Sequence, residues 1–164
     1  MATQWHLAQL NVGRTVAPLD DPRLAGFMNR LDEINAIAEG SPGYVWRLQS
    51  DSGNATDIQV TDDPLFIINL TVWLSIEALF DFAYRSEHKT VVKQRSDYFE
   101  RWPGPNVVLW WQPAGIVPDV QDALRRLRRL EEHGPTPEAF SFKVRFPPPE
   151  PGEQPAAEPS FAPG

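Results

Sequence analysis

Residues 65–79 read LFIINLTVWLSIEAL and decide the fold. The first nine of them form the most hydrophobic run of the chain and predict a strand. Apolar side chains fall on both faces of that strand, which is typical of a strand in the middle of a sheet that is covered on both sides. Ser75 is a suitable N-cap for a helix, and Glu77 in the first turn suits the helix dipole. This stretch therefore predicts a central strand that runs directly into a helix.

Further elements are predicted on both sides of this stretch. Apolar residues that recur at the helical period predict helices over 21–40, 76–99 and 119–133. Runs of apolar residues bounded by turn residues predict strands over 5–12, 44–49, 65–73, 106–111 and 139–146. The predicted order is β-α-β-β-α-β, followed by an extra α-β.

The first six elements give an α+β fold, the ferredoxin-like split βαβ sandwich. In this arrangement two helices cover one face of the sheet, and the other face needs cover that a second subunit can provide. We therefore expect a homodimer with an extra C-terminal α-β unit in each subunit.

The chain is expected to hold one domain and a tail. Residues 1–146 make the domain, and residues 147–164 read PPPEPGEQPAAEPSFAPG. Such a proline-rich segment buries too little apolar surface to offset the entropy lost on ordering, so we expect a disordered tail.

Composition excludes several classes of protein. The 164 residues include no cysteine, which removes disulfides and thiolate chemistry. The net charge of −7 argues against nucleic acid as a partner, and the cluster at 125–129 (RRLRR) is interpreted as the solvated face of a helix. Neither a signal peptide nor an apolar run of about 18 residues is present, so we expect a cytoplasmic protein without membrane contact.

Four segments carry a resemblance to a known group of proteins: 41–48 (SPGYVWRL), 73–79 (WLSIEAL), 84–88 (YRSEH) and 109–111 (LWW). They resemble an uncharacterised domain family of the dimeric α+β barrel superfamily, which includes proteins like the antibiotic-biosynthesis monooxygenases. The resemblance implies a dimeric α+β barrel with a pocket in each subunit, between the sheet and the helices. Superfamily members include cofactor-free quinone-forming oxygenases, haem degraders, polyketide cyclases, dehalogenating isomerases and proteins without known activity.

Four polar residues of the second predicted helix are the candidate catalytic groups. At about 100° per residue, one narrow arc of that helix holds Glu77, Tyr84, His88 and Arg95. His88 would be a general acid or base, Tyr84 would donate a hydrogen bond to a substrate oxygen, and Arg95 would hold an enolate, phenolate or carboxylate. Glu77 would orient one of these groups. The alternative is an ordinary row of neighbours on a partly exposed helix, which a bend near residues 86–87 would misalign.

Aromatic residues would form a flat wall for a planar substrate. The candidate substrate-binding residues are Trp46, Trp73, Asn69, Phe80, Trp110 and Trp111. The three histidines are too scattered for a zinc site, so no metal is predicted.

The function predicted first is a cofactor-independent monooxygenase or a cyclase/isomerase that acts on a planar aromatic or polyketide-like metabolite. Two alternatives stay open. One is a haem-binding or haem-degrading protein, because His88 alone would suffice as a haem ligand. The other is a non-catalytic dimer that binds a small molecule.

Overall fold

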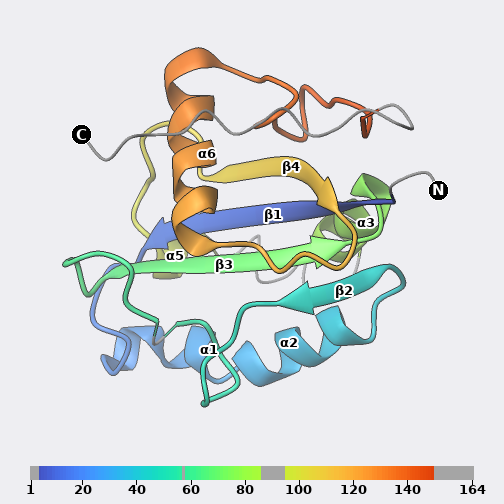
Figure 1. Cartoon of the computed structure of the whole chain (residues 1–164). Helices are drawn as coiled ribbons and strands as arrows, with labels where there is room; N and C mark the ends of the chain where they lie inside the picture. The colour runs from blue at the N-terminus through green and yellow to red at the C-terminus, as the bar shows by residue number, and fades with distance from the viewer. Residues whose placement is uncertain (1–3, 57, 86–94, 150–164) are drawn as a thin grey trace.

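The computed structural model describes residues 4–56, 58–85 and 95–149 (Figure 1). One antiparallel sheet has the strand order β2-β3-β1-β4. Its strands are β1 (Trp5–Arg14), β2 (Tyr44–Arg47), β3 (Phe66–Trp73) and β4 (Val107–Pro113). The helices are η1 (Pro22–Leu24), α1 (Ala25–Met28), α2 (Leu31–Glu39), α3 (Ile76–Arg85), α5 (Arg95–Tyr98) and α6 (Val120–His133).

The α+β class is confirmed, and the strand order is consistent with the ferredoxin-like arrangement. The predicted central strand lies between β2 and β1, and α3 follows it almost at once. Asp119 caps α6 by accepting a hydrogen bond from the backbone N–H of Asp122 at 2.9 Å. The sequence pattern therefore located the main elements.

Three predicted elements differ from the structure, and two of them are helices. The segment 21–40 is divided into η1, α1 and α2, because the chain leaves helical hydrogen bonding around Asn29. The predicted helix over 76–99 is described only as α3 and α5, and residues 86–94 lie outside the described part.

The predicted strand over 139–146 is wrong. Phe140 forms a single bridge with Leu109, and the chain then turns, with the backbone N–H of Ser141 donating to the carbonyl of Val144 at 3.3 Å. The alternating phenylalanines of this segment pack as side chains against the sheet edge, as Phe140 and Phe146 do, and need no strand to do so.

Helix α6 covers one face of the sheet, in front of it in Figure 1. Ala123, Leu127 and Leu130 of α6 are buried against a fully apolar row on the strands. That row consists of Ala8, Leu10, Val12, Ile68, Leu70, Val72, Val108 and Trp110. The expectation of an uncovered sheet face was therefore wrong, because the extra C-terminal helix supplies the cover within the same chain.

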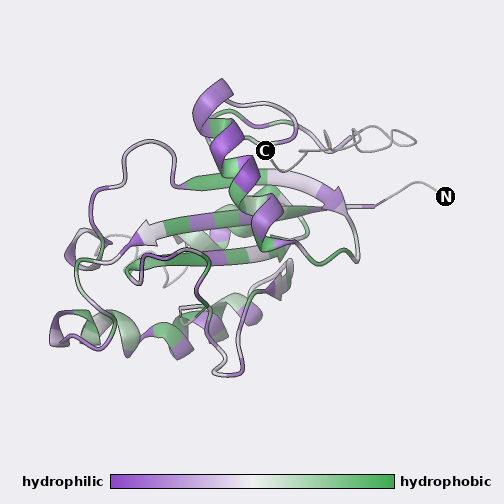
Figure 2. Cartoon of the chain, turned by 60° about the vertical axis from the view of Figure 1, so that its left-hand side comes forward, coloured by the Kyte–Doolittle hydropathy of each residue, from purple (hydrophilic) through white to green (hydrophobic). Residues whose placement is uncertain are grey.

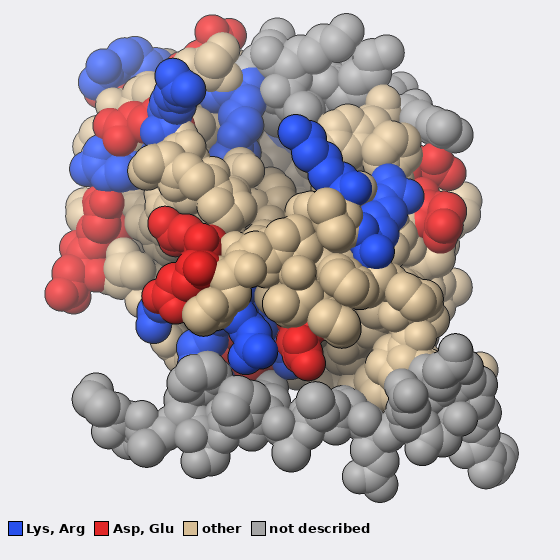
Figure 3. Space-filling view, turned by 90° about the horizontal axis from the view of Figure 1, so that it is seen from above, with Lys and Arg blue, Asp and Glu red and all other residues tan. Residues whose placement is uncertain are grey.

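The outer surface of α6 carries the arginine cluster. Hydrophilic and hydrophobic residues alternate around this helix in Figure 2. Arg126 donates to Asp122 at 2.8 Å, and Arg125 lies 3.7 Å from the same carboxylate. Figure 3 shows basic and acidic residues side by side on the face viewed from above. Arg128 is exposed, whereas Arg126 also donates to the carbonyl of Glu138 at 2.7 Å and lies over the Trp110 ring, so the cluster is only partly a solvated face.

On the other face of the sheet, a large apolar cluster covers one end. There Leu7, Trp73 and Leu109 pack with Leu79 and Phe82 of α3. The rest of this face borders a cavity and carries polar residues on β1 and β3, with Ile67 and Val107 beside them. Within the described ranges, no helix is both long and apolar enough to cross a membrane.

Candidate functional site: a cavity between sheet and helices

A cavity of about 370 Å³ lies between the polar part of the sheet and the helices α1, α2, α3 and α5. Its volume falls within the range of about 300–1,000 Å³ that is usual for small-molecule sites. The residues that line it include no aspartate or glutamate in the described part of the chain. The cavity is therefore built from neutral polar, cationic and apolar side chains.

Four polar side chains of β1 and β3 form the floor of this cavity, and we call them the polar floor. In the strand register Gln9 is opposite Thr71, and Asn11 is opposite Asn69. All four face the cavity because side chains alternate between the two faces of a strand. Their chain neighbours Leu10 and Leu70 point to the α6 side and are fully buried.

Hydrogen bonds order one half of the polar floor. The indole Nε1–H of Trp73 donates to Thr71 Oγ1 at 2.9 Å, and Thr71 Oγ1–H donates to Gln9 Oε1 at 2.7 Å. The side-chain amides of Asn11 and Asn69 have no recorded protein partner in the described part of the chain. They are available to a ligand.

Three arginines line the cavity, and they differ in whether a described carboxylate balances their charge. Arg47 donates to Glu39 at 2.8 Å and to the carbonyl of Gly53 at 2.7 Å, so its charge is balanced. Arg95 and Arg30 also line the cavity, and no ion pair with a described carboxylate is recorded for either. These two guanidinium groups give the site its positive character.

Arg95 is held in place by neutral groups. Its Nη2 donates to the carbonyl of Val12 at 3.0 Å, and its Cζ lies 4.6 Å from the centre of the Phe99 ring. Burial lowers the pKa of this guanidinium from its ordinary value. The lowered pKa reports a desolvated cation, which an anionic ligand would stabilise.

Aromatic and aliphatic side chains complete the walls. The aromatic lining residues are Phe27, Phe82, Tyr84, Tyr98, Phe99 and Phe142. The ring centroid of Phe27 lies 5.3 Å from that of Phe99, and the two rings meet edge to face. Such walls suit a flat apolar ligand body.

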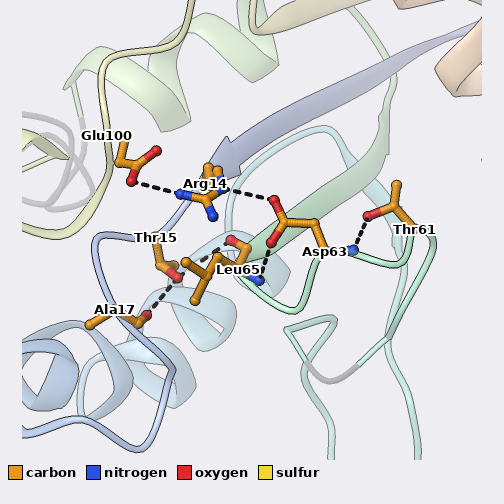
Figure 4. A network of polar contacts seen from close by, with 7 residues as sticks. All are labelled: Arg14, Thr15, Ala17, Thr61, Asp63, Leu65 and Glu100. Atoms are coloured by element: carbon orange, nitrogen blue, oxygen red, sulfur yellow. Dashed lines mark hydrogen bonds and ion pairs between the residues drawn. The ribbon is translucent and has the colours of Figure 1, made fainter.

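A polar network at the end of β1 positions two irregular segments next to the cavity (Figure 4). Arg14 donates to Asp63 and to Glu100, both at 2.7 Å. Asp63 belongs to the connection that leads into β3, and Glu100 follows α5. The backbone N–H of Val16 also donates to the carbonyl of Tyr98 at 2.9 Å. The network therefore ties α5, which carries Arg95, to the end of β1.

Three of the residues predicted from the sequence meet at this cavity: Asn69, Tyr84 and Arg95. Tyr84 is 45% exposed and stands at the rim, where its ring centroid lies 5.7 Å from that of Phe142. The predicted base His88 lies outside the described residues.

The other predicted residues do not line the cavity. Glu77 is exposed at the start of α3, and the ring of Phe80 packs on Tyr84 at a centroid distance of 4.8 Å. Trp73 is buried beside Thr71 on the same face of β3, and Trp111 donates through Nε1 to the carbonyl of Phe146 at 2.9 Å. The remaining tryptophans, which pack on the α6 side, are Trp46 and Trp110.

Sequence reasoning missed Gln9, Asn11 and Thr71. The signal is the alternation itself: polar residues occupy every second position at 9 and 11 and again at 69 and 71. The register places Gln9 directly opposite Thr71 and Asn11 directly opposite Asn69, so all four side chains lie on one face. Within the described ranges, no group of three or more His, Cys, Asp or Glu side chains is arranged to hold a metal ion.

Fold and site together define an α+β protein with a ligand-sized cavity between its sheet and its helices, and the described lining residues include no carboxylate. The chain belongs to the family described as "Domain of unknown function (DUF3291)", whose sequence model matches residues 6–156. The superfamily suggested by the sequence motifs goes beyond this finding and stays a proposal.

Comparison with other proteins adds one distant likeness. No curated protein matches the chain. A solved structure titled "Structural Genomics, protein YJCS" is similar at 13% identity and a TM-score of 0.41, covering 65% of this chain and 96% of that chain. A likeness this distant says nothing about the activity of the chain.

Proposed function

We propose that the chain is a small-molecule enzyme that binds a planar aromatic or polyketide-like metabolite in the cavity. The observation that carries this proposal is the combination of lining groups: a hydrogen-bonding floor, two arginines without an acidic partner among the described residues, and aromatic walls. Convergent polar groups in an otherwise apolar cavity are typical of ligand sites.

The chemistry that we propose is cofactor-independent: oxygenation, or a cyclisation or isomerisation driven by proton transfer. Arg95 and the floor amides stabilise the oxygen of an enolate or phenolate through hydrogen bonds to the charge that develops. Tyr84 at the rim contacts the part of the substrate that reaches the opening. Proton abstraction is assigned to His88, as the sequence predicts.

Other parts of the prediction remain expectations. Haem binding depends on His88, which lies outside the described residues, and no described contact favours it. The homodimer and the cytoplasmic location are likewise proposals, and the dimer no longer rests on an uncovered sheet face because α6 covers that face.

The proposal is tested by turnover without added metal, flavin or haem. The purified chain is incubated in air with 1,8-dihydroxyanthrone and with a linear aryl polyketone, and products are followed by absorbance and mass spectrometry. Oxygenation gives a quinone that has gained one oxygen and lost two hydrogens, with one molecule of dioxygen consumed and water released. Cyclisation or isomerisation gives a product with a changed retention time.

Two variants make the assay specific to the cavity. We expect Asn11→Ala and Arg95→Ala to lower kcat/KM by about tenfold or more, as the loss of a charge-stabilising donor does. Arg128→Ala, at an exposed position of α6 on the opposite side of the sheet, serves as the control and keeps full activity. Equal turnover by all three variants, or no turnover of either compound, contradicts the proposal.

A further inference from the structure

Trp73 fixes the direction of the hydrogen bonds at the floor of the cavity. An indole N–H can only donate, so Thr71 Oγ1 is the acceptor of the bond from Trp73 at 2.9 Å. Thr71 Oγ1 is then left with its own hydrogen to donate, and Gln9 Oε1 lies 2.7 Å away. The three groups form a relay that runs from Trp73 through Thr71 to Gln9.

This relay determines which end of the Gln9 amide meets the ligand. With the amide reversed, its NH₂ group would face Thr71, whose hydroxyl hydrogen would find no acceptor among the described residues. Such a buried donor without a partner costs about 1–3 kcal/mol. Gln9 therefore accepts with Oε1 and keeps Nε2, with its two N–H donors, for the cavity that it lines.

The Gln9 side chain is buried and is held by a hydrogen bond at its Oε1 end. Only 5% of the residue is exposed, yet no hydrogen bond from its Nε2 is recorded in the part of the chain that the structure describes. Because Nε2 is not completely enclosed, it opens onto the cavity, where water or a ligand can accept its hydrogen bonds. The side chain is held on one side and open on the other.

The charges around the cavity favour an anion as that partner. Arg95 and Arg30 line the cavity without a recorded carboxylate partner, and the described lining residues include no acidic side chain. Guanidinium groups favour carboxylate, phenolate or enolate oxygens, and amide N–H groups can donate to the same oxygens. Arg95 is held at the carbonyl of Val12, three residues along β1 from Gln9, so it contributes its charge to the cavity as a whole. A cationic ligand would meet two like charges.

We propose that the cavity selects planar ligands that carry an anionic oxygen, and that Gln9 binds this oxygen while Thr71 positions Gln9. The inference rests on the proposed function and adds the charge of the substrate and the residues that recognise it. Trp73, predicted as part of the substrate wall, lies beside Thr71 on the same face of β3 and directs its hydroxyl group.

The probes are 2-naphthoate and its neutral analogue 2-naphthamide, titrated calorimetrically into the full-length chain at about pH 8, far above the ordinary glutamate pKa of about 4.3. We expect 2-naphthoate to bind about tenfold more tightly than 2-naphthamide. Gln9→Glu keeps the acceptor for Thr71 but replaces the NH₂ group by a second oxygen, and should weaken 2-naphthoate binding about tenfold or more. Gln121→Glu, exposed on α6, adds the same charge elsewhere and should leave binding unchanged.

A second pair of variants tests the positioning role. Thr71→Val removes the hydroxyl and should weaken 2-naphthoate binding severalfold, whereas Thr71→Ser restores the relay and the affinity. Near-ultraviolet circular dichroism checks that each variant is folded. Rescue by serine would show that the hydroxyl group of residue 71, and not the packing of its side chain, positions Gln9.

The outcomes separate this inference from the proposed function. Equal binding of the two probes, or 2-naphthoate binding that Gln9→Glu leaves unchanged, overturns the inference but leaves a cavity that binds planar rings. Absence of binding by both probes overturns the inference together with the proposed function.

Discussion

Leu10 and Leu70 point to α6, whereas their chain neighbours Asn11 and Asn69 point to the cavity. The leucines are completely buried in an apolar layer. The asparagines have no recorded side-chain partner in the described part of the chain. The same two strands thus supply a dry core on one face and an open set of hydrogen-bonding groups on the other. We therefore expect stability to depend mainly on the α6 face, and the proposed ligand binding to depend on the cavity face.

The largest difference in the free energy of unfolding is expected between substitutions of two adjacent residues of β3. Leu70→Ala removes a fully buried side chain and should lower the free energy of unfolding by about 2–5 kcal/mol. Asn69→Ala should change it by only about 0.5 kcal/mol, because the side chain is exposed to the cavity and makes no recorded bond. Urea denaturation measures both values. Similar losses in the two variants would mean that the faces do not differ as described.

Gly13 tests how closely α5 packs on the cavity face. A methyl group at this position would lie 2.7 Å from Cδ1 of Phe99 and 3.0 Å from Nη2 of Arg95. Gly13→Ala should therefore destabilise the chain by about 1–3 kcal/mol through overpacking. Thermal unfolding provides the measurement, with Gly40→Ala as the control, since a methyl there meets its nearest atom at 3.5 Å. An unchanged melting temperature in Gly13→Ala would show that α5 packs less closely.

Arg95 is expected to serve binding more than stability. Arg95→Met keeps an unbranched chain over the Phe99 ring but removes a desolvated cation, so unfolding should change by about 1 kcal/mol or less. Binding of 2-naphthoate should be lost in the same variant. Arg14→Met, which breaks ion pairs with Asp63 and Glu100, should lower stability without removing a cavity group. A large loss of stability in Arg95→Met would contradict this division.

The smallest effect is a dependence of stability on pH at the end of β1. The pKa of Asp63 is lowered by the hydrogen bond from the backbone N–H of Leu65 and by that from Arg14. A carboxyl group whose pKa is lower in the folded state stabilises the fold above its ordinary pKa of 3.8, and this contribution is lost as the pH falls further. Melting temperatures of the wild type and Asp63→Asn should therefore converge in acid. A difference in melting temperature that is the same at every pH would contradict the contribution of the Asp63 carboxylate to stability.

Much of the fold follows from local patterns in the sequence. The apolar run before Ser75 indicates the central strand, and Asp119 indicates where α6 begins. The place of α6 on the sheet is a tertiary property, decided by which apolar surface its leucines cover. For that reason the pattern of the helix could not reveal that it packs on that face of the sheet.

The candidate site was predicted only in part. Arg95, Tyr84 and Asn69 were identified by residue type and face the cavity. The tryptophans were chosen for their chemistry, but large apolar rings are drawn into the core, as Trp73 and Trp110 are. The floor pairing depends on strand register, which brings Gln9 to Thr71 across 62 residues of chain. Short-range patterns do not contain that information.

The most direct test of the two-face account is a map of side-chain amide signals by nuclear magnetic resonance during a titration with 2-naphthoate. The account predicts that the NH₂ signals of Gln9, Asn11 and Asn69 shift, while that of Gln112, buried on the α6 side, stays in place. Shifts confined to the α6 side, with the floor amides unmoved, would contradict it.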